Sequence, residues 1–199
     1  HPSTLARYGD VEAVAVLIPG RQQAEYVLFV RDRDPTRETW DGRRAGPEGA
    51  VRDYGADDAF PVGDIDDILP GLLERCGRVY YSMGVNLDFD QRVVGWVNTL
   101  RGQTKLGIHS PQEFVALEHP LHDMRLLKSK AEATVMKRSA QIAVGAHVRA
   151  MRTTRPGVTE YEVMAELLHE FHRHQADISY HPIVGSGPNA TTLHYGAST

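Results

Sequence analysis

The secondary-structure signals in this chain change character near Pro120, and this change limits the folds that the chain can adopt. Before Pro120, short apolar runs typical of strands alternate with patterns typical of helices. Such an alternation predicts an α/β layer sandwich rather than an all-helical body. After Pro120 come two long amphipathic helical patterns. We therefore expect two domains, one over residues 1–122 and one over residues 123–199.

The N-terminal part begins with two predicted strands. Val11–Ile18 and Tyr26–Val30 are rich in β-branched, aliphatic and aromatic residues, with turn residues between them. Residues 31–58 are charged and glycine-rich, which predicts a surface loop carrying one isolated aromatic residue, Trp40. The further elements expected here are a helix from Asp64 to Leu73 that Pro70 kinks or shortens, a buried strand at Arg78–Ser82, a helix at Leu87–Leu100 and one or two helical turns at Pro111–Leu117.

Two helix-start signals define the C-terminal part. Ser129-x-x-Glu132 and Thr159-x-x-Glu162 are capping boxes, in which the hydroxyl and the glutamate each satisfy a backbone amide of the first turn. They predict helices at about Lys130–Met151 and Glu160–His174. The apolar faces expected on these helices consist of Met136, Ala140, Ala143, His147 and Met151 on the first, and Met164, Leu167, Leu168 and Phe171 on the second.

Composition excludes some classes of partner. The formal net charge is −4 at pH 7, and no basic run stands beside aromatic residues, so we expect no nucleic acid partner. A single cysteine, Cys76, cannot form an internal disulfide, which favours a reducing compartment and the cytoplasm. No run of 18 apolar residues is present, so we expect no membrane span. The chain begins without an initiator methionine, and we expect the sequence to be part of a longer polypeptide.

Several residues near the C-terminal end could carry chemistry. His169 and His172 are three residues apart rather than the four of a zinc-protease helix, and no third ligand follows at suitable spacing. This favours a solvated helix end, where His174 and its neighbours complement the helix dipole, over a metal site. His147 lies between alanines and methionines, which favours a packed core residue.

The stretch from Ile183 to Tyr195 contains the more interesting histidine. It predicts a strand interrupted by a turn at Gly185–Gly187. A tight turn is favoured here over a phosphate-binding loop, because the glycines lack the Gly-Lys-Ser/Thr ending of a nucleotide loop. His194 follows this turn, where a rigid strand end can aim an imidazole at a cleft. No Gly-x-Ser-x-Gly elbow is present, which argues against a serine hydrolase. Cys76 lies at the end of a predicted helix, where the dipole raises a thiol pKa and disfavours a nucleophile.

Together these motifs resemble those of a known peptidase family. The motif Arg125-x-x-Lys128-Ser129-x-x-Glu132, the turn Arg155-Pro156-Gly157 and the Ile183–Tyr195 stretch are similar to the opening third of the pita-bread catalytic domain of metallo-aminopeptidases that remove the residue before a proline. Trp40-Asp41-Gly42-Arg43-Arg44 resembles a segment in the N-terminal domain of bacterial aminopeptidase P. The resemblance extends from about Val11 to Tyr195. It implies a creatinase-like α/β N-terminal domain followed by the first part of a pita-bread α+β domain.

The resemblance also implies a mechanism and a set of site residues. Members of the family hold two divalent metal ions, usually manganese, on residues beyond the His-Tyr pair, so it implies no metal ligand in this chain. It assigns His194 to substrate contact and to stabilising the tetrahedral intermediate, and Tyr180 to the neighbourhood of the metals. Arg125 and Trp40 are weaker candidates for substrate binding. A metal pair activates water and polarises the carbonyl, so we expect the 199-residue chain alone to be inactive.

The implied partners are a proline-containing peptide and either a homo-oligomer or the remaining segment of the same protein. Two other functions remain open. One is a non-catalytic binding or assembly module with the same architecture. The other is a relative that acts on Xaa-Pro dipeptides or on creatine.

Overall fold

A computed structural model describes residues 13–196 of the chain. It divides into two compact units, His1–Leu121 and His122–Thr199, and each unit is described by itself below. The division lies close to the boundary proposed from the sequence after residue 122. Val11 and Glu12, the first residues of the first predicted strand, lie outside the described residues.

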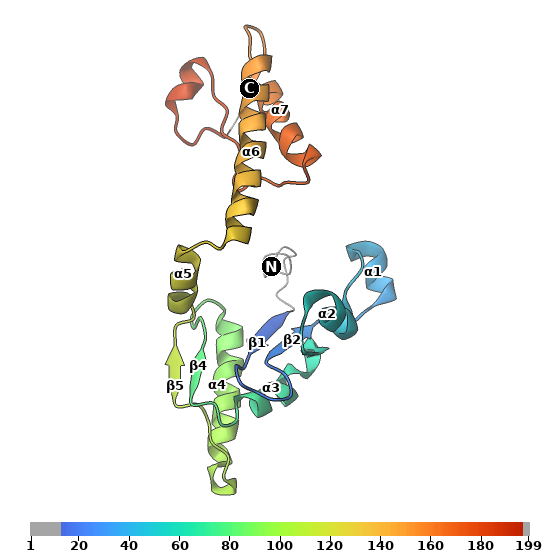
Figure 1. Cartoon of the computed structure of the whole chain (residues 1–199), viewed down its shortest axis with the longest axis vertical. Coiled ribbons are helices and arrows are strands. Elements are labelled where there is room, and N and C mark those ends of the chain that lie inside the picture. Colours follow the sequence, from blue (N-terminus) through green and yellow to red (C-terminus); the bar gives the residue numbers. More distant parts are fainter. Residues whose placement is uncertain (1–12, 197–199) are drawn as a thin grey trace. The chain divides into compact units, whose positions relative to one another are not determined.

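A mixed three-stranded sheet is the centre of the N-terminal unit (Figure 1). Its strands are β1 (Val14–Leu17), β2 (Tyr26–Val30) and β3 (Asp58–Pro61), in the order β1-β2-β3. β1 pairs with β2 antiparallel, whereas β3 pairs with β2 in parallel. β2 is buried over most of its length, as its unbroken apolar run requires when both faces of a strand are covered.

Residues 31–58 were predicted to be a surface loop, and this prediction was wrong. The segment contains two helices, α1 (Pro35–Asp41) and α2 (Gly46–Tyr54), before β3 begins. The physical reason is that its polar residues and glycines are helix caps. The Asp34 carboxylate accepts from the backbone amides of Thr36 and Arg37 at 3.0 and 3.1 Å, and Gly55 ends α2 in the left-handed conformation.

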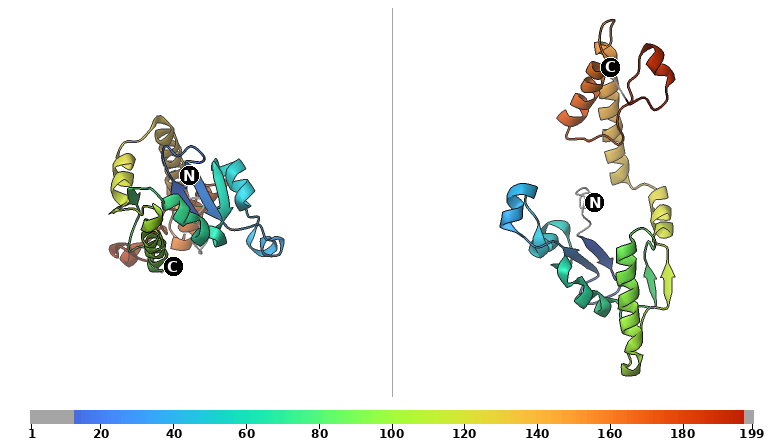
Figure 2. Two further views of the ribbon diagram at one scale, coloured as in Figure 1. Left: turned by 90° about the horizontal axis from the view of Figure 1, so that it is seen from below. Right: turned by 180° about the vertical axis from the view of Figure 1, so that it is seen from behind.

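Two helices build the main core of this unit against the sheet. They are α3 (Ile65–Leu73), preceded by a 3-10 turn at Val62–Asp64, and α4 (Leu87–Gly102), followed by another at Thr104–Leu106. α3 continues for about one turn past Pro70. The buried cluster that joins these elements consists of Ala24, Val27, Phe29, Ile65, Leu69, Leu72, Val93 and Trp96. Figure 2 shows α3 and α4 from two further sides.

A small two-stranded sheet lies in the same unit. Its parallel strands are β4 (Arg78–Tyr80) and β5 (Glu113–Val115). Pro111–Leu117 therefore contains a strand and not the predicted helical turns. The ladder with β4 overrides the local pattern, and an ion pair between Arg78 and Glu113 spans it. The strand predicted at Arg78–Ser82 was expected to be buried, but β4 is only partly buried, since Tyr80 is 48% exposed.

The C-terminal unit consists mainly of an antiparallel helix pair (Figure 2). After α5 (Glu118–Leu126), which contains the point of division, α6 (Lys130–Thr153) and α7 (Glu160–Arg173) pack against each other. Both predicted capping boxes are confirmed. The Glu132 carboxylate accepts from the Ser129 amide at 2.7 Å, and the Glu162 carboxylate accepts from the Thr159 amide at 2.8 Å.

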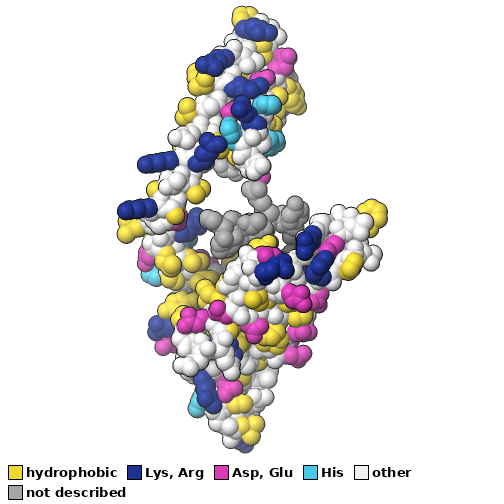
Figure 3. Space-filling view, turned by 45° about the vertical axis from the view of Figure 1, so that its right-hand side comes forward, with side chains coloured by type: hydrophobic (Ala, Val, Ile, Leu, Met, Phe, Trp, Pro, Cys, Tyr) yellow, Lys and Arg dark blue, Asp and Glu magenta, His cyan; other side chains and the backbone are white. Residues whose placement is uncertain are grey.

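The predicted apolar face of α6 was only partly right. The buried residues of α6 are Ile142 and Ala146, while Met136 and Met151 are 55% and 69% exposed. His147 is also exposed rather than packed in a core, and its Nδ1 contacts the carbonyl oxygen of Ala143 at 2.8 Å. The reason is that α7 packs on a neighbouring stripe of α6. Lys, Arg and apolar side chains are consequently interspersed on the surface of this unit (Figure 3).

The two capping glutamates predict a pH dependence of this helix pair. Hydrogen bonds from the Thr159 backbone and hydroxyl hold the pKa of Glu162 below its ordinary value of 4.5, and those from Ser129 do the same for Glu132. A group whose pKa is lower in the folded state stabilises the fold at pH values above its unfolded-state pKa. This stability is lost as the pH falls through the folded-state pKa. We expect the melting temperature of the α6–α7 helix pair, measured by circular dichroism, to decrease when the pH is lowered below about 4.5.

The matched control is the double variant E132Q/E162Q. Its amides keep the hydrogen-bonding shape but do not titrate, so the double variant should lose less stability than the unmodified chain between pH 7 and pH 3, by about the capping contribution. Equal pH profiles for the two proteins would contradict the prediction.

Candidate active-site segment and its relatives

The segment from Ile183 to Tyr195 does not form the predicted strand. In the part of the chain that the structure describes, Gly187–Thr191 is a 3-10 helix and no strand pairs with Ile183 or Val184. The reason is that a strand needs a neighbour to take its backbone hydrogen bonds, and none of the described strands lies beside this segment. The segment is also not a tight turn between two strands.

Glu160 organises this segment, and sequence reasoning missed it. The residue is only 3% exposed, and its Oε1 accepts three hydrogen bonds from residues more than 25 positions along the chain. They come from the Ser186 amide at 2.6 Å, the Ser186 hydroxyl at 3.0 Å and the Asn189 side chain at 3.1 Å. The available signal was an acidic residue at the first helical position, which a capping box alone does not require.

His194 lies at the end of this organised segment and is exposed. Within residues 13–196 the structure gives its imidazole no hydrogen-bond partner, while the adjacent Leu193 is 89% exposed. An imidazole that is free of internal bonds can donate an N–H or accept a proton from a bound molecule. The geometry therefore leaves His194 available for the contact predicted for it.

The other predicted site residues are exposed as well. Tyr180 is 77% exposed, and Arg125 lies near the end of α5, where its carbonyl oxygen accepts from the Lys128 ammonium group. Trp40, in α1 of the N-terminal unit, is 84% exposed. Among the described residues no hydrogen bond or ion pair joins these side chains to one another or to His194. Their common site stays a prediction.

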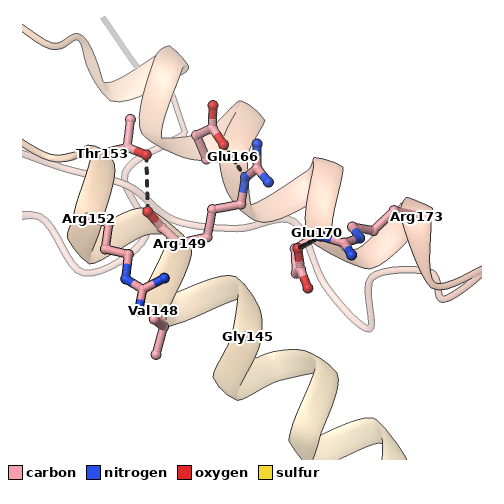
Figure 4. Close-up of a pocket in the computed structure, with 8 residues that line it drawn as sticks. All are labelled: Gly145, Val148, Arg149, Arg152, Thr153, Glu166, Glu170 and Arg173. Atoms are coloured by element: carbon pink, nitrogen blue, oxygen red, sulfur yellow. Dashed lines mark hydrogen bonds and ion pairs between the residues drawn. The ribbon is translucent and has the colours of Figure 1, made fainter.

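The pocket between α6 and α7 is a packing feature rather than a second site (Figure 4). This hollow of about 440 Å³ is lined by Gly145, Val148, Arg149, Arg152, Thr153, Glu166, Glu170 and Arg173. The Arg149 guanidinium is already paired with Glu166, and Arg173 is paired with Glu170 at 3.2 Å. Two of the three arginines that line the pocket are thus already paired, Arg149 with a glutamate of α7 and Arg173 with a glutamate one turn earlier in its own helix. The pocket therefore has no strong preference for an anion.

The histidine cluster at the end of α7 belongs to the same helix contact. Glu170 is 8% exposed, and His174 Nε2 lies 3.1 Å from its Oε1. His174 Nδ1 lies 3.1 Å from the guanidinium of Arg138 on α6. His174 therefore joins the two helices instead of facing solvent alone. Between residues 13 and 196 there is no group of three or more His, Cys, Asp or Glu residues that could hold a metal ion.

Cys76 has a raised thiol pKa, as predicted, and burial of the thiol is the cause. Its Sγ lies just beyond the end of α3 and donates to the Leu72 carbonyl in the last turn of that helix at 3.3 Å. A raised pKa lowers the thiolate fraction at neutral pH, which disfavours nucleophilic chemistry.

As for membranes, no described helix is both long and apolar enough to cross a bilayer.

Comparison with known proteins agrees with these features. A family model described as aminopeptidase P, N-terminal domain, matches residues 9–80, and one described as metallopeptidase family M24 matches residues 134–199. The Xaa-Pro aminopeptidase of Escherichia coli is 38% identical over 190 residues, which cover 94% of this chain and 43% of that protein. Human Xaa-Pro aminopeptidase 3 is 29% identical and is covered to 38%.

Solved structures show the same likeness. The structure of Pseudomonas aeruginosa aminopeptidase PepP is 54% identical with a TM-score of 0.87, over 94% of this chain and 43% of that one. Escherichia coli aminopeptidase P, solved in complex with substrate, is 38% identical with a TM-score of 0.84 over the same shares. The chain thus spans less than half the length of these relatives. Its fold is the one seen in the corresponding part of these aminopeptidase P structures, a creatinase-like α/β domain followed by part of an M24 domain.

Proposed function

We propose that this chain is the N-terminal domain and the first part of the catalytic domain of an Xaa-Pro aminopeptidase. Such an enzyme hydrolyses the peptide bond before proline and releases the N-terminal residue. The observation that supports the proposal most is the 38% identity to the Escherichia coli Xaa-Pro aminopeptidase over 190 residues. The exposed imidazole of His194, at the end of a segment tied to a buried carboxylate, fits a substrate-facing role.

The residues of this chain would bind and orient the peptide. His194 would donate a hydrogen bond to the carbonyl oxygen as negative charge develops on it, which is the point where a donor contributes most to rate. Tyr180 and Arg125 would contact the substrate from the same unit. Trp40, in α1, would contribute to the substrate site of a second subunit in a homo-oligomer.

The proposed reaction also needs two divalent metal ions, for which manganese is the expected metal. When bound, such a pair lowers the pKa of a bridging water and polarises the scissile carbonyl. The described residues do not fit this role, because no cluster of three potential ligands lies between residues 13 and 196. We therefore assign no metal ligand to them. The cytoplasm is the proposed compartment.

The test is a peptidase assay on the complete gene product. With Mn²⁺ present, it should release alanine from Ala-Pro-Ala and leave Ala-Ala-Ala intact, and the 199-residue chain alone should release none. Ala-Pro is the third substrate, because hydrolysis confined to the dipeptide would indicate an Xaa-Pro dipeptidase. Failure to cleave any of the three peptides would indicate a non-catalytic module and would overturn the proposal.

A further inference from the structure

Glu160 is a buried acidic residue that the proposed mechanism does not use. It is the first residue of α7, directly after the N-cap Thr159, and it is 3% exposed. The capping box accounts for Thr159 and Glu162 but leaves the Glu160 side chain unexplained. Acidic side chains are almost never fully buried unless they are paired or hydrogen-bonded, so the contacts of Glu160 indicate what it does.

Three donors to Glu160 converge on one oxygen and come from one short segment. Oε1 accepts from the amide and the hydroxyl of Ser186 and from the side-chain amide of Asn189. This oxygen therefore ties the start of the 3-10 helix to the start of α7. The fold of the segment is tight, because a Cβ at Gly185 would lie 3.2 Å from the backbone carbon and oxygen of Asn189.

A second bond continues from Asn189 to the neighbour of His194. Asn189 Nδ2 also donates to the Tyr195 hydroxyl, at 3.1 Å. An amide nitrogen carries two hydrogens, so both bonds from Nδ2 can exist at once. The path runs from Glu160 through Asn189 to Tyr195, which is adjacent to the predicted catalytic histidine.

We propose that Glu160 is a positioning residue that holds residues 186–195 in one conformation and thereby sets the place of the His194 imidazole. Without Glu160, the backbone of this segment would regain conformational freedom, since none of the described strands supports it. A displaced imidazole would meet the reacting carbonyl less often. The structural part of this proposal stands on the contacts alone, and its catalytic part rests on the proposed function.

The structural part is tested by amide hydrogen exchange on the 199-residue chain. Glu160→Ala should speed exchange of the Ser186 amide about tenfold or more, because that amide loses its buried hydrogen-bond acceptor. Glu160→Gln keeps an acceptor oxygen and should give a smaller increase. The matched control is Glu166→Ala in the same helix, whose carboxylate pairs with Arg149 instead, and it should leave residues 183–195 unchanged.

Two results would overturn the structural part. One is unchanged exchange of residues 183–195 in Glu160→Ala. The other is an equal acceleration throughout α6 and α7, which would show that Glu160 merely stabilises the whole unit.

The catalytic part is tested by a double-mutant cycle in the complete gene product with Mn²⁺. Glu160→Ala should lower kcat on Ala-Pro-Ala about tenfold when His194 is present, but less than about twofold in the His194→Ala background, because positioning acts through that side chain. Glu160→Gln should restore part of the loss. Equal losses in both backgrounds would overturn the catalytic part. A complete protein without peptidase activity would instead refute the proposed function and leave the exchange result in place.

Discussion

Phe29→Ala is expected to lower the unfolding free energy of the N-terminal unit by about 3–5 kcal/mol. Phe29 lies in the central strand β2 and is 0% exposed. Its ring packs against Phe60 with the ring centroids 5.8 Å apart, in the same cluster as Ile65 and Trp96. Alanine would remove this apolar surface and leave a cavity that a close-packed core closes only in part. Because single domains are stable by about 5–15 kcal/mol, a loss of this size would leave much of the unit unfolded on heating.

Urea unfolding followed by circular dichroism measures this loss. The matched control is Leu17→Ala in the neighbouring strand β1, where the side chain is 71% exposed. A surface truncation of this kind should change the unfolding free energy by no more than about 0.5 kcal/mol. A Phe29→Ala cost below about 1 kcal/mol, or one equal to that of Leu17→Ala, would show that β2 is not the centre of the core.

The second large effect is on catalysis. In the complete gene product, His194→Ala should lower kcat on Ala-Pro-Ala about 10²–10³-fold, the range found when one donor to a developing oxyanion is removed. His194 is exposed and has no hydrogen-bond partner among residues 13–196, so the substitution should barely change folding stability. Steady-state kinetics at saturating Mn²⁺, together with a thermal melt of each protein, separates the two effects.

His172→Ala is the matched control for this experiment. His172 is also exposed, but it lies near the end of α7 rather than in the Glu160-bound segment. Its removal should leave kcat within about twofold of the unmodified enzyme, a difference of less than about 0.5 kcal/mol. A His194→Ala variant with normal kcat would remove this histidine from the mechanism while leaving the similarity to aminopeptidase P untouched.

Local sequence signals determined the helices α3, α4, α6 and α7 and the strands β1, β2 and β4, but they missed α1 and α2. The capping boxes at Ser129 and Thr159 predicted the starts of α6 and α7 because the groups that satisfy the first amides lie within three residues of each other. The run Tyr26–Val30 predicted a strand because its β-branched, aromatic and aliphatic residues favour an extended backbone, while its central and buried position is a finding of the structure. The motifs also predicted a resemblance to aminopeptidase P, and the comparisons confirm this resemblance.

Only the tertiary structure decided the features that depend on distant partners. The strand at Glu113–Val115 exists because β4 lies beside it. Ile183–Val184 forms no strand because none of the described strands lies beside that segment. The exposed position of His147 follows from the stripe of α6 that α7 covers. Glu160 meets Ser186 across 26 residues, a pairing that no local pattern encodes. Helix caps act over one turn of chain, whereas ladders, buried faces and the hydrogen bonds of Glu160 depend on segments that only folding brings together.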